Sequence, residues 1–173
     1  MNTIYFLATL LILTVSSRVS IGLPFECDTL VSKTISVCKY ESEIQREKSI
    51  AQEVPYILTL MQIVDSTVEL SKRDQLAKDV ATAGQVITST KERHAWYILL
   101  SLESKFDQTA VSPVGAVGIG QVLPIDMKYL KNVTGIKTTK SALTKDVNVN
   151  LKVSAAFFNY LLKIKESTIL ALV

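Results

Sequence analysis

Apolar residues recur at intervals of three and four along most of the chain, which is the spacing of amphipathic helices. Within residues 56–70, one helical face collects Ile57, Leu60, Met61, Val64 and Val68. Within residues 148–167, one stripe collects Leu151, Ala155, Phe158 and Leu162. The sequence contains neither a long alternation of strand period nor an internal repeat. The pattern therefore predicts a mainly α protein.

Local signals predict where several helices begin. The polar run at residues 39–53 is typical of an exposed helix with charge pairs four residues apart. Pro55 suits the first turn of the helix that follows, so we expect a helix start there. Residues 71–84 predict a more polar helix, and Ser89 or Thr90 is the candidate N-cap of the next one.

The chain begins with an uncharged, apolar segment. No charged side chain precedes Arg18, and the apolar run Ile4–Val15 suits the hydrophobic region of an export signal. A membrane span needs about 20 residues, and the small residues Ser20 and Gly22 permit cleavage after Gly22. We expect residues 1–22 to be a signal peptide or a membrane anchor, with a buried core helix as the third alternative. Either leading alternative places the remaining residues outside the cytoplasm.

Two cysteines, Cys27 and Cys38, follow this segment, and the chain has no others. An even number of cysteines after an export signal favours one disulfide. On one continuous helix, residues 11 positions apart lie about 16 Å apart, which is too far for a bridge. A disulfide therefore requires a turn between them, and two free buried thiols are the alternative.

Composition and charge narrow the class of protein only slightly. At 173 residues with 48% hydrophobic residues, the chain is long enough for one globular domain and an appendage. The formal net charge of +3 is too small and too scattered to indicate a nucleic-acid-binding protein. An anionic cell wall or membrane surface is equally compatible with this charge.

The segment LESKFDQTAVSPVGAVGIGQVLP, residues 102–124, combines an unusual acid with a glycine-rich loop. Glu103 ends an apolar helix, and the helical repeat of 100° per residue places it on the same side as Trp96 and Leu99. A carboxyl group beside apolar side chains is desolvated, which raises its pKa and suits a general acid. The alternative is a glutamate at a helix C-terminus that points into water.

The loop excludes several kinds of site. Three glycines, Gly115, Gly118 and Gly120, indicate a tight turn, but no Lys-Ser/Thr pair follows them as in a phosphate-binding loop. His94 is the only histidine and lies far from both cysteines in the sequence, so we expect no metal site. A G-x-S-x-G motif is also absent. A single acid next to amide and hydroxyl donors suits a sugar chain. These donors are Ser104, Ser112 and Gln121.

The same residues resemble the core of the soluble lytic transglycosylase family. The family pattern is glutamate-serine, alanine-x-serine, glycine-alanine-x-glycine, then glutamine and proline. It is matched in order by Glu103-Ser104, Ala110-Val111-Ser112, Gly115-Ala116-Val117-Gly118, Gln121 and Pro124. The resemblance continues into the asparagine-led helix of residues 146–163 and covers residues 85–173. Residues 23–84 match no family pattern, so we expect a helical N-terminal region there.

The resemblance implies a lysozyme-like, mainly helical lytic transglycosylase domain that acts on peptidoglycan without a cofactor. It implies that Glu103 protonates the glycosidic oxygen between N-acetylmuramic acid and N-acetylglucosamine and then acts as a base, giving a 1,6-anhydro product. Ser104, Ser112, Gly118 and Gln121 would bind the substrate. Because the muramoyl hydroxyl attacks internally, a second carboxylate is not needed. We expect Asp107 and Asp126 to be solvated.

The chain departs from the family pattern at two places. Ile119-Gly120 stands where the family often has leucine-methionine, so we expect a wider or looser cleft floor. The family's alanine-tyrosine-asparagine motif would begin after Val173, so we expect a catalytic domain that is incomplete at its C-terminus. A truncated sequence, a cleft completed by another chain, and a weak or inactive form are the three explanations.

The resemblance also predicts a setting for the protein. Such domains open the cell wall locally during phage entry, secretion or conjugation, so we expect an exported protein, periplasmic, membrane-associated or in a virion. Its partners would be glycan strands and a larger envelope-spanning or virion complex, without nucleic acid. Two alternatives are a non-catalytic glycan-binding or structural component and a membrane-anchored assembly factor that acts through residues 23–84.

Overall fold

The computed structural model describes residues 27–124 and 127–170, with side chains described for residues 39–124 and 127–165. The expected signal or anchor segment, residues 1–22, lies outside these ranges, as does Asp126. The chain divides into two compact units, Met1–Glu41 and Ser42–Val173. None of the helices in the described part is both long and apolar enough to span a membrane.

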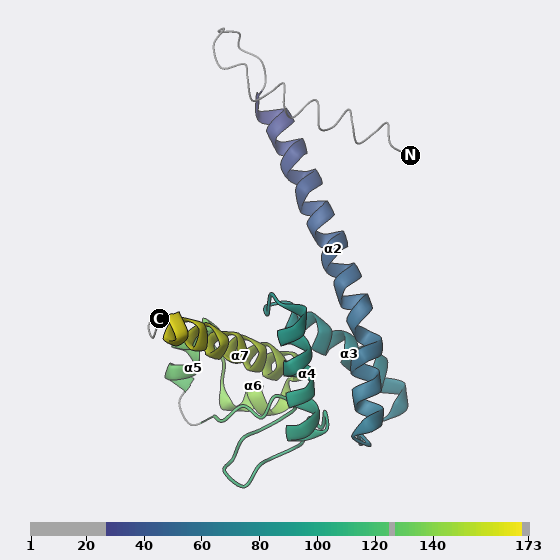
Figure 1. The fold of residues 1–173 in the computed structure, drawn as a ribbon, viewed down its shortest axis with the longest axis vertical. Helices are drawn as coiled ribbons and strands as arrows, with labels where there is room; N and C mark the ends of the chain where they lie inside the picture. Colours follow the sequence, from purple (N-terminus) through teal and green to yellow (C-terminus); the bar gives the residue numbers. More distant parts are fainter. Residues whose placement is uncertain (1–26, 125–126, 171–173) are drawn as a thin grey trace. The chain divides into compact units, whose positions relative to one another are not determined.

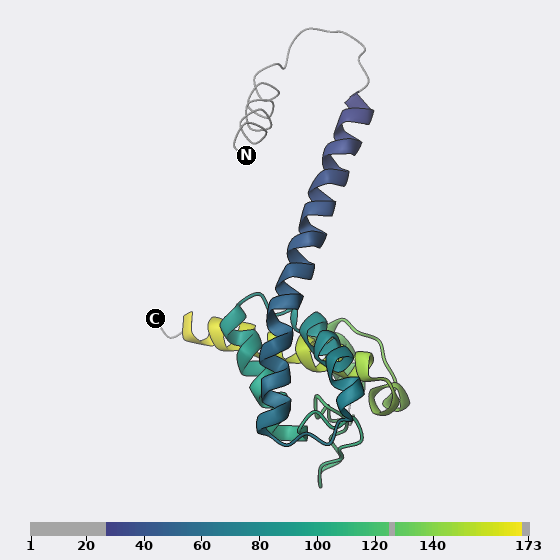
Figure 2. The same ribbon diagram turned by 90° about the vertical axis from the view of Figure 1, so that its right-hand side faces the viewer.

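Six helices make up most of the described residues, which confirms the mainly α fold (Figure 1). They are α2 (Cys27–Ile63), α3 (Leu70–Gly84), α4 (Thr90–Ser104), α5 (Met127–Thr134), α6 (Lys140–Lys145) and α7 (Val147–Leu170). Within the second unit, α7 is the central helix and contacts α3, α5 and α6. The loop after α4 starts at the lower end of that helix in both ribbon views (Figures 1 and 2).

Helix α2 differs from the sequence prediction at Pro55 and at its end. The helix runs through Pro55 without a break and ends at Ile63, so the predicted start at Pro55 is wrong. Proline removes one backbone hydrogen bond from a helix interior. Burial of Ile50 and Ile57, on either side of the proline, compensates for that loss. The helix stops where Asp65 adopts a positive φ of 50°.

The two cysteines both lie on α2, so the expectation of a disulfide needs correction. Cys27 and Cys38 belong to one uninterrupted helix. Eleven residues of α-helix separate two Cα atoms by about 16 Å, whereas a disulfide joins Cα atoms less than about 7 Å apart. A bridge between them would require a turn that α2 does not contain.

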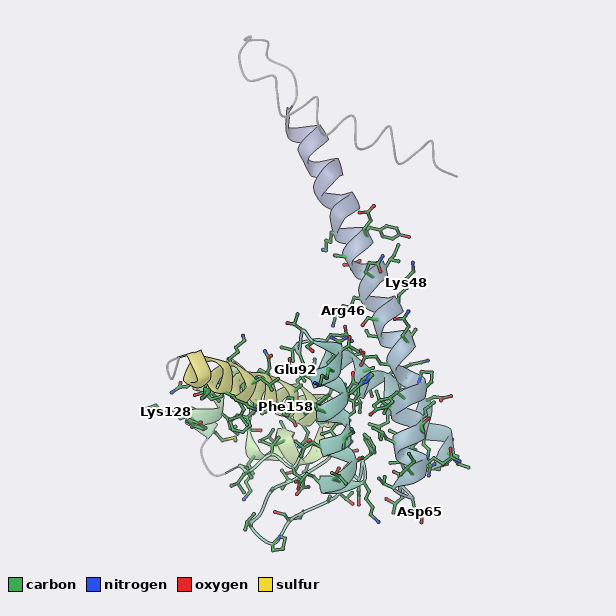
Figure 3. The ribbon with its side chains drawn as sticks, in the orientation of Figure 1. Arg46, Lys48, Asp65, Glu92, Lys128 and Phe158 are labelled. Atoms are coloured by element: carbon green, nitrogen blue, oxygen red, sulfur yellow. The ribbon has the colours of Figure 1, made fainter. Side chains whose placement is uncertain are left out.

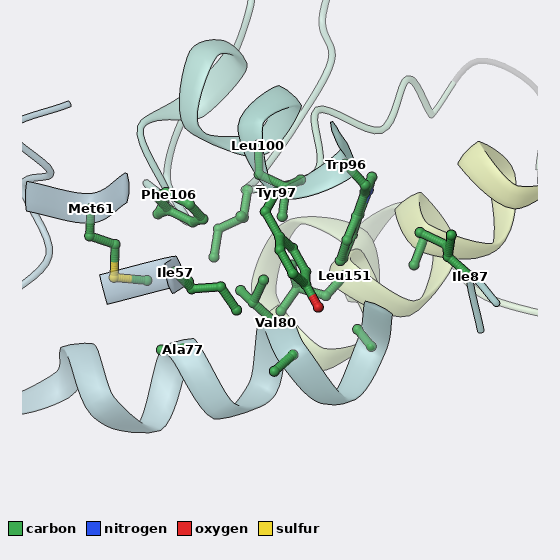
Figure 4. Packing of buried hydrophobic residues seen from close by; sticks show 14 of the residues in the cluster. Ile57, Met61, Ala77, Val80, Ile87, Trp96, Tyr97, Leu100, Phe106 and Leu151 are labelled. Atoms are coloured by element: carbon green, nitrogen blue, oxygen red, sulfur yellow. The ribbon is translucent and has the colours of Figure 1, made fainter. Parts of the chain in front are cut away.

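The core of the second unit is built by residues from both sides of position 85 (Figure 4). Ile57 and Met61 of α2 are fully buried in the same cluster as Trp96 and Tyr97 of α4. The remaining buried members are Ile50, Ala77, Val80, Ala81, Ala83, Ile87, Leu100, Phe106, Ile119, Leu151 and Ala155. The predicted domain boundary at residues 84 and 85 lies inside this unit and would divide its core.

A buried ionic cluster connects α2 to α4. Arg93 Nε donates to Glu53 Oε1 at 2.6 Å, and the hydroxyl of Tyr97 donates to the other carboxylate oxygen. The guanidinium also donates to the carbonyl oxygens of Ile87 and Thr88 at 2.8 and 2.9 Å. Burial, and then the hydrogen bond to Glu53, raise the pKa of Tyr97. Every charge in this cluster has a partner, which buried charges require.

Candidate active site

Helix α4 places Glu103 at the rim of a cleft. The helix begins at the predicted N-cap Ser89, whose hydroxyl accepts from the amide of Glu92, and this confirms the cap. It ends after Ser104, where Lys105 adopts a left-handed conformation with φ 53°. Glu103 therefore lies in the last turn, as predicted. Its side chain is exposed, which agrees with the alternative of a glutamate at a helix C-terminus that points into water.

The loop after α4 is a compact backbone structure. Val111 pairs with Val117, and Val117 pairs with Val122, in antiparallel bridges. Ser112 closes the turn between the first pair, because its amide donates to the oxygen of Ala116 and its hydroxyl accepts from the amide of Ala116 at 3.0 Å. The loop thus has a shape that its own backbone and side-chain hydrogen bonds define.

Asn150 of α7 holds this loop in place. Its amide nitrogen donates to the oxygens of Val117 and Leu143 at 2.9 and 3.0 Å, and its side-chain oxygen accepts from the amide of Gly120 at 2.7 Å. Gly118 has a positive φ of 72°, and a Cβ there would lie 2.5 Å from the Asn150 nitrogen. The sequence needs glycine at this position both for the conformation and for the space.

Ser104, one of the predicted substrate-binding residues, is buried against the loop. Its hydroxyl is buried within hydrogen-bond distance of the oxygens of Leu100 and Ile119, at 3.0 and 2.8 Å, and accepts from the amide of Phe106 at 3.1 Å. Neither Ser104 nor Gly118 lines the cleft that contains Glu103. Both residues shape the loop.

The cleft between α4, the loop and α7 has a volume of about 360 Å³. Three of the predicted site residues, Glu103, Ser112 and Gln121, line it together. The other lining residues are Trp96, Leu99, Leu100, Val114, Ala116, Gly120, Ser154, Phe157, Phe158 and Leu161. Figure 3 shows Phe158 on the part of α7 near α4. A mostly apolar cleft with a few convergent polar groups is typical of a small-molecule or sugar site.

Two polar groups beside Glu103 remain available to a ligand. The amide nitrogen of Gln121 donates to the oxygens of Gly118 and Ala110 at 2.8 and 3.4 Å. These bonds leave the Gln121 amide oxygen available as an acceptor. The Ser112 hydroxyl accepts from the amide of Ala116, which leaves its hydrogen available as a donor. The cleft therefore presents an acid, an acceptor and a donor along an apolar wall.

Of the pair Ile119-Gly120, only Gly120 is part of the described lining of the cleft. Ile119 is fully buried, and Gly120 lies directly against Ser154 of α7. A Cβ on Gly120 would be 2.3 Å from the Cβ of Ser154, so no larger residue fits without movement. Ser154 in turn accepts a hydrogen bond of 3.2 Å from the indole nitrogen of Trp96. Close backbone approach replaces the bulky side chain that the family pattern has at this position.

Among the described residues, the nearby acid Asp107 and two further cavities lie outside this site. Asp107 accepts two hydrogen bonds from Thr109, at 2.7 and 2.8 Å, and stabilises the turn after α4. Its carboxylate is not part of the cleft lining. Two cavities of about 600 Å³ lie elsewhere, one of them lined by Arg46 and Lys152, so cavity size alone does not identify the site. Within the described residues, no group of three His, Cys, Asp or Glu side chains could hold a metal ion.

Sequence reasoning missed the residues that α7 contributes to the site. Phe157, Phe158 and Ser154 form the wall opposite α4, and Asn150 positions the loop. A signal for Asn150 was present, because this polar residue sits at the start of an apolar stripe. The two phenylalanines carried no such signal, since adjacent aromatics are also typical of a helix core.

Residues 88–173 match the family of the transglycosylase SLT domain. No curated protein and no solved structure matches the chain. The matched segment begins one residue before the cap of α4 and includes Glu103, the loop and all of α7 that the structure describes. Residues 88–173 of this chain therefore belong to the transglycosylase SLT domain family, a lysozyme-like family of peptidoglycan transglycosylases.

Proposed function

We propose that this protein is a lytic transglycosylase in which Glu103 acts first as the acid and then as the base. The carboxyl group of Glu103 gives its proton to the oxygen that links N-acetylmuramic acid C1 to N-acetylglucosamine. The bond from C1 to this oxygen breaks, and the N-acetylglucosamine hydroxyl leaves. The C6 hydroxyl of the same muramoyl residue then attacks C1 and returns its proton to Glu103. The product carries a 1,6-anhydro ring, and the acid is regenerated.

One observation carries this proposal: Glu103 is the single acidic residue among the described residues that line the cleft. Hydrolysis by the two usual glycosidase mechanisms needs two carboxyl groups flanking the bond, one of them to activate water or attack the sugar. The internal attack of a muramoyl hydroxyl needs only one. The composition of the cleft therefore favours the transglycosylase reaction over hydrolysis.

The exposed position of Glu103 is compatible with this chemistry if the substrate itself excludes water. Leu99, Phe157 and Leu161 line the cleft with Glu103. A glycan that fills the cleft would displace water from the carboxyl group and leave it among these apolar side chains. A desolvated carboxylic acid favours its protonated form, which the first step requires.

Digestion of purified peptidoglycan tests the proposal. The wild-type protein should release anhydro-muropeptides, recognised by a mass one water lower than that of reducing-end products. Glu103→Gln should abolish the release, because an amide cannot give or take the proton. Glu92→Gln is the matched control, since Glu92 is also on α4 but outside the cleft, and it should keep full activity. Reducing-end products would show a hydrolase.

Glycan binding without cleavage would instead support the alternative of a non-catalytic component that keeps the fold. In that outcome, Glu103→Gln and wild type would bind glycan equally and release no product. The exposed acid and the small cleft make this the alternative to exclude first.

We further propose that the protein acts outside the cytoplasm, where peptidoglycan lies, and opens the wall locally for phage entry, secretion or conjugation. Export would depend on residues 1–22. Protease treatment of intact and of permeabilised cells tests the location, because a protein outside the cytoplasmic membrane should be degraded without lysis of that membrane.

A further inference from the structure

The Glu103 cleft is small compared with a polymeric substrate. Its volume of about 360 Å³ is near the lower end of the roughly 300–1,000 Å³ that small-molecule sites occupy. A glycan strand that places one bond at Glu103 must therefore continue over the neighbouring surface. The side chains on that surface decide how the rest of the strand is held.

An aromatic patch of three residues, Tyr129, Phe157 and Tyr160, adjoins the cleft. Phe157 lines the cleft and also packs edge-on against Tyr129, with ring centroids 6.4 Å apart and an interplanar angle of 73°. Phe157 and Tyr160 are stacked, with centroids 6.3 Å apart and an angle of 29°. Tyr129 comes from α5, which lies beside α7 (Figure 3 labels its neighbour Lys128).

The patch is accessible from solvent. Tyr129 is 46% exposed, and Phe157 and Tyr160 are partly exposed. Partial desolvation, and then the nearby phenol of Tyr160, raise the pKa of Tyr129, so the Tyr129 phenol is neutral at physiological pH. Neutral, half-exposed aromatic rings combine an apolar face with a polar hydroxyl, which is the surface that a sugar needs.

A second, smaller cavity lies on the other side of the patch. It has a volume of about 250 Å³ and is lined by Tyr160 together with Asn159 and Lys163. Val86, Val133, Thr134 and Ala156 complete the lining. Since Phe157 borders the cleft and its stacked neighbour Tyr160 borders this cavity, the patch joins the two hollows.

The chemistry of the patch and cavity matches an N-acetylated glycan. Pyranose rings have apolar C–H faces that pack on aromatic rings, and their acetamido groups need both hydrogen-bond donors and acceptors. Asn159 supplies both kinds of group, and Lys163 supplies a donor. No acidic side chain belongs to the described lining of this cavity, so anionic muramoyl substituents would not be repelled.

We propose that Tyr129, Phe157 and Tyr160 form an extended sugar-binding surface that carries the glycan strand from the Glu103 cleft to the cavity at Asn159 and Lys163. This inference rests on the proposed function, because it assumes that the occupant of the cleft is a glycan. It assigns the tyrosines a role in holding longer strands, separate from the chemistry at Glu103.

Binding of chitin oligosaccharides tests the proposal without any need for turnover. Trp96 is the single tryptophan and lines the cleft, so its fluorescence reports occupancy of the cleft by the probe. In the Glu103→Gln background, the hexamer of N-acetylglucosamine should bind more tightly than the trimer. Adding Tyr129→Leu or Tyr160→Leu should weaken hexamer binding about three- to tenfold and leave trimer binding unchanged.

Three further variants complete the experiment. Tyr129→Phe and Tyr160→Phe keep the ring and should retain most of the hexamer affinity. Tyr40→Leu is the matched control, since Tyr40 is 66% exposed on α2 and has no part in the patch. Unchanged trimer binding also shows that the leucine variants keep a folded cleft.

Failure of this inference can be distinguished from failure of the proposed function. Suppose that the protein cleaves peptidoglycan but the leucine variants lose trimer and hexamer binding equally, or lose neither. The proposed sugar-binding surface is then refuted, and the proposed transglycosylase activity is supported. If the protein cleaves no peptidoglycan but the leucine variants lose hexamer binding and keep trimer binding, the sugar-binding surface is supported and the transglycosylase activity is refuted. If neither the trimer nor the hexamer binds, the inference is overturned.

Discussion

The contact between Gly120 and Ser154 yields the sharpest quantitative prediction. In Gly120→Ala, the new Cβ would lie 2.3 Å from the Ser154 Cβ and 2.6 Å from its Oγ. The loop cannot easily move away, because Asn150 binds the Gly120 amide and the neighbouring carbonyl of Val117. Overpacking of this kind costs about 1–3 kcal/mol, so we expect a loss of about 2 kcal/mol in the free energy of unfolding.

Ser154→Gly should relieve this clash. Alone, it costs about 1 kcal/mol for a glycine inside a helix and about 1 kcal/mol for the lost hydrogen bond from Trp96. In the double variant, the closest remaining atom to the new Cβ is the Asn150 oxygen at 3.1 Å. The double variant should therefore lose about 2 kcal/mol, whereas the two single losses add to about 4 kcal/mol.

Urea unfolding followed by far-ultraviolet circular dichroism measures all four proteins of this cycle. Gly115→Ala is the control, because Gly115 has a positive φ of 86° but no neighbour within 4 Å. Its cost should add to that of Ser154→Gly. If Gly120→Ala and Ser154→Gly also add to within about 0.5 kcal/mol, the steric explanation of Gly120 is refuted.

Substitution of three buried polar side chains should change stability or activity in distinct ways. Glu53→Gln should lower the free energy of unfolding by about 3–5 kcal/mol, because Arg93 keeps a buried charge without its carboxylate; a loss below about 1 kcal/mol in urea unfolding would contradict this. Asn150→Ala leaves the Val117 and Gly120 backbone groups without their partner, so amide hydrogen exchange in residues 110–122 should accelerate and peptidoglycan cleavage should fall at least about tenfold. Unchanged exchange would show that the loop does not depend on this side chain. The raised pKa of Tyr97 means that above about pH 10 the native protein binds more protons than the unfolded chain, so stability should fall as pH rises. Tyr97→Phe should lose less stability than wild type between about pH 9 and pH 11, and identical pH profiles would disprove the assignment.

The parts of the fold that depend on local sequence could be predicted. The N-cap at Ser89, the helix that follows and the place of Glu103 in its last turn all follow from helical spacing and capping within a few residues. Ser112 and Gln121 line the same cleft as Glu103, and their closeness to it could be expected because one short loop after α4 carries both.

The parts that depend on distant contacts could not be predicted. The sequence around Pro55 favours a helix start, but burial on both sides of the proline keeps α2 continuous. The hydroxyl of Ser104 looked available to a sugar, yet Ile119, 15 residues away, occupies it. The walls that α7 contributes to the cleft likewise depend on a contact between distant segments, which neither helix encodes alone.

The ionic cluster at Glu53 limits how the matched family segment can be moved into another protein. The matched family segment starts at residue 88, but Arg93 and Tyr97 take their carboxylate partner from α2. A gene fusion that moved only residues 88–173 would carry the cleft, but the Arg93 guanidinium and the Tyr97 hydroxyl would lose their carboxylate partner. A transfer of the matched segment must therefore also include the part of α2 that carries Glu53, which belongs to the same compact unit, Ser42–Val173.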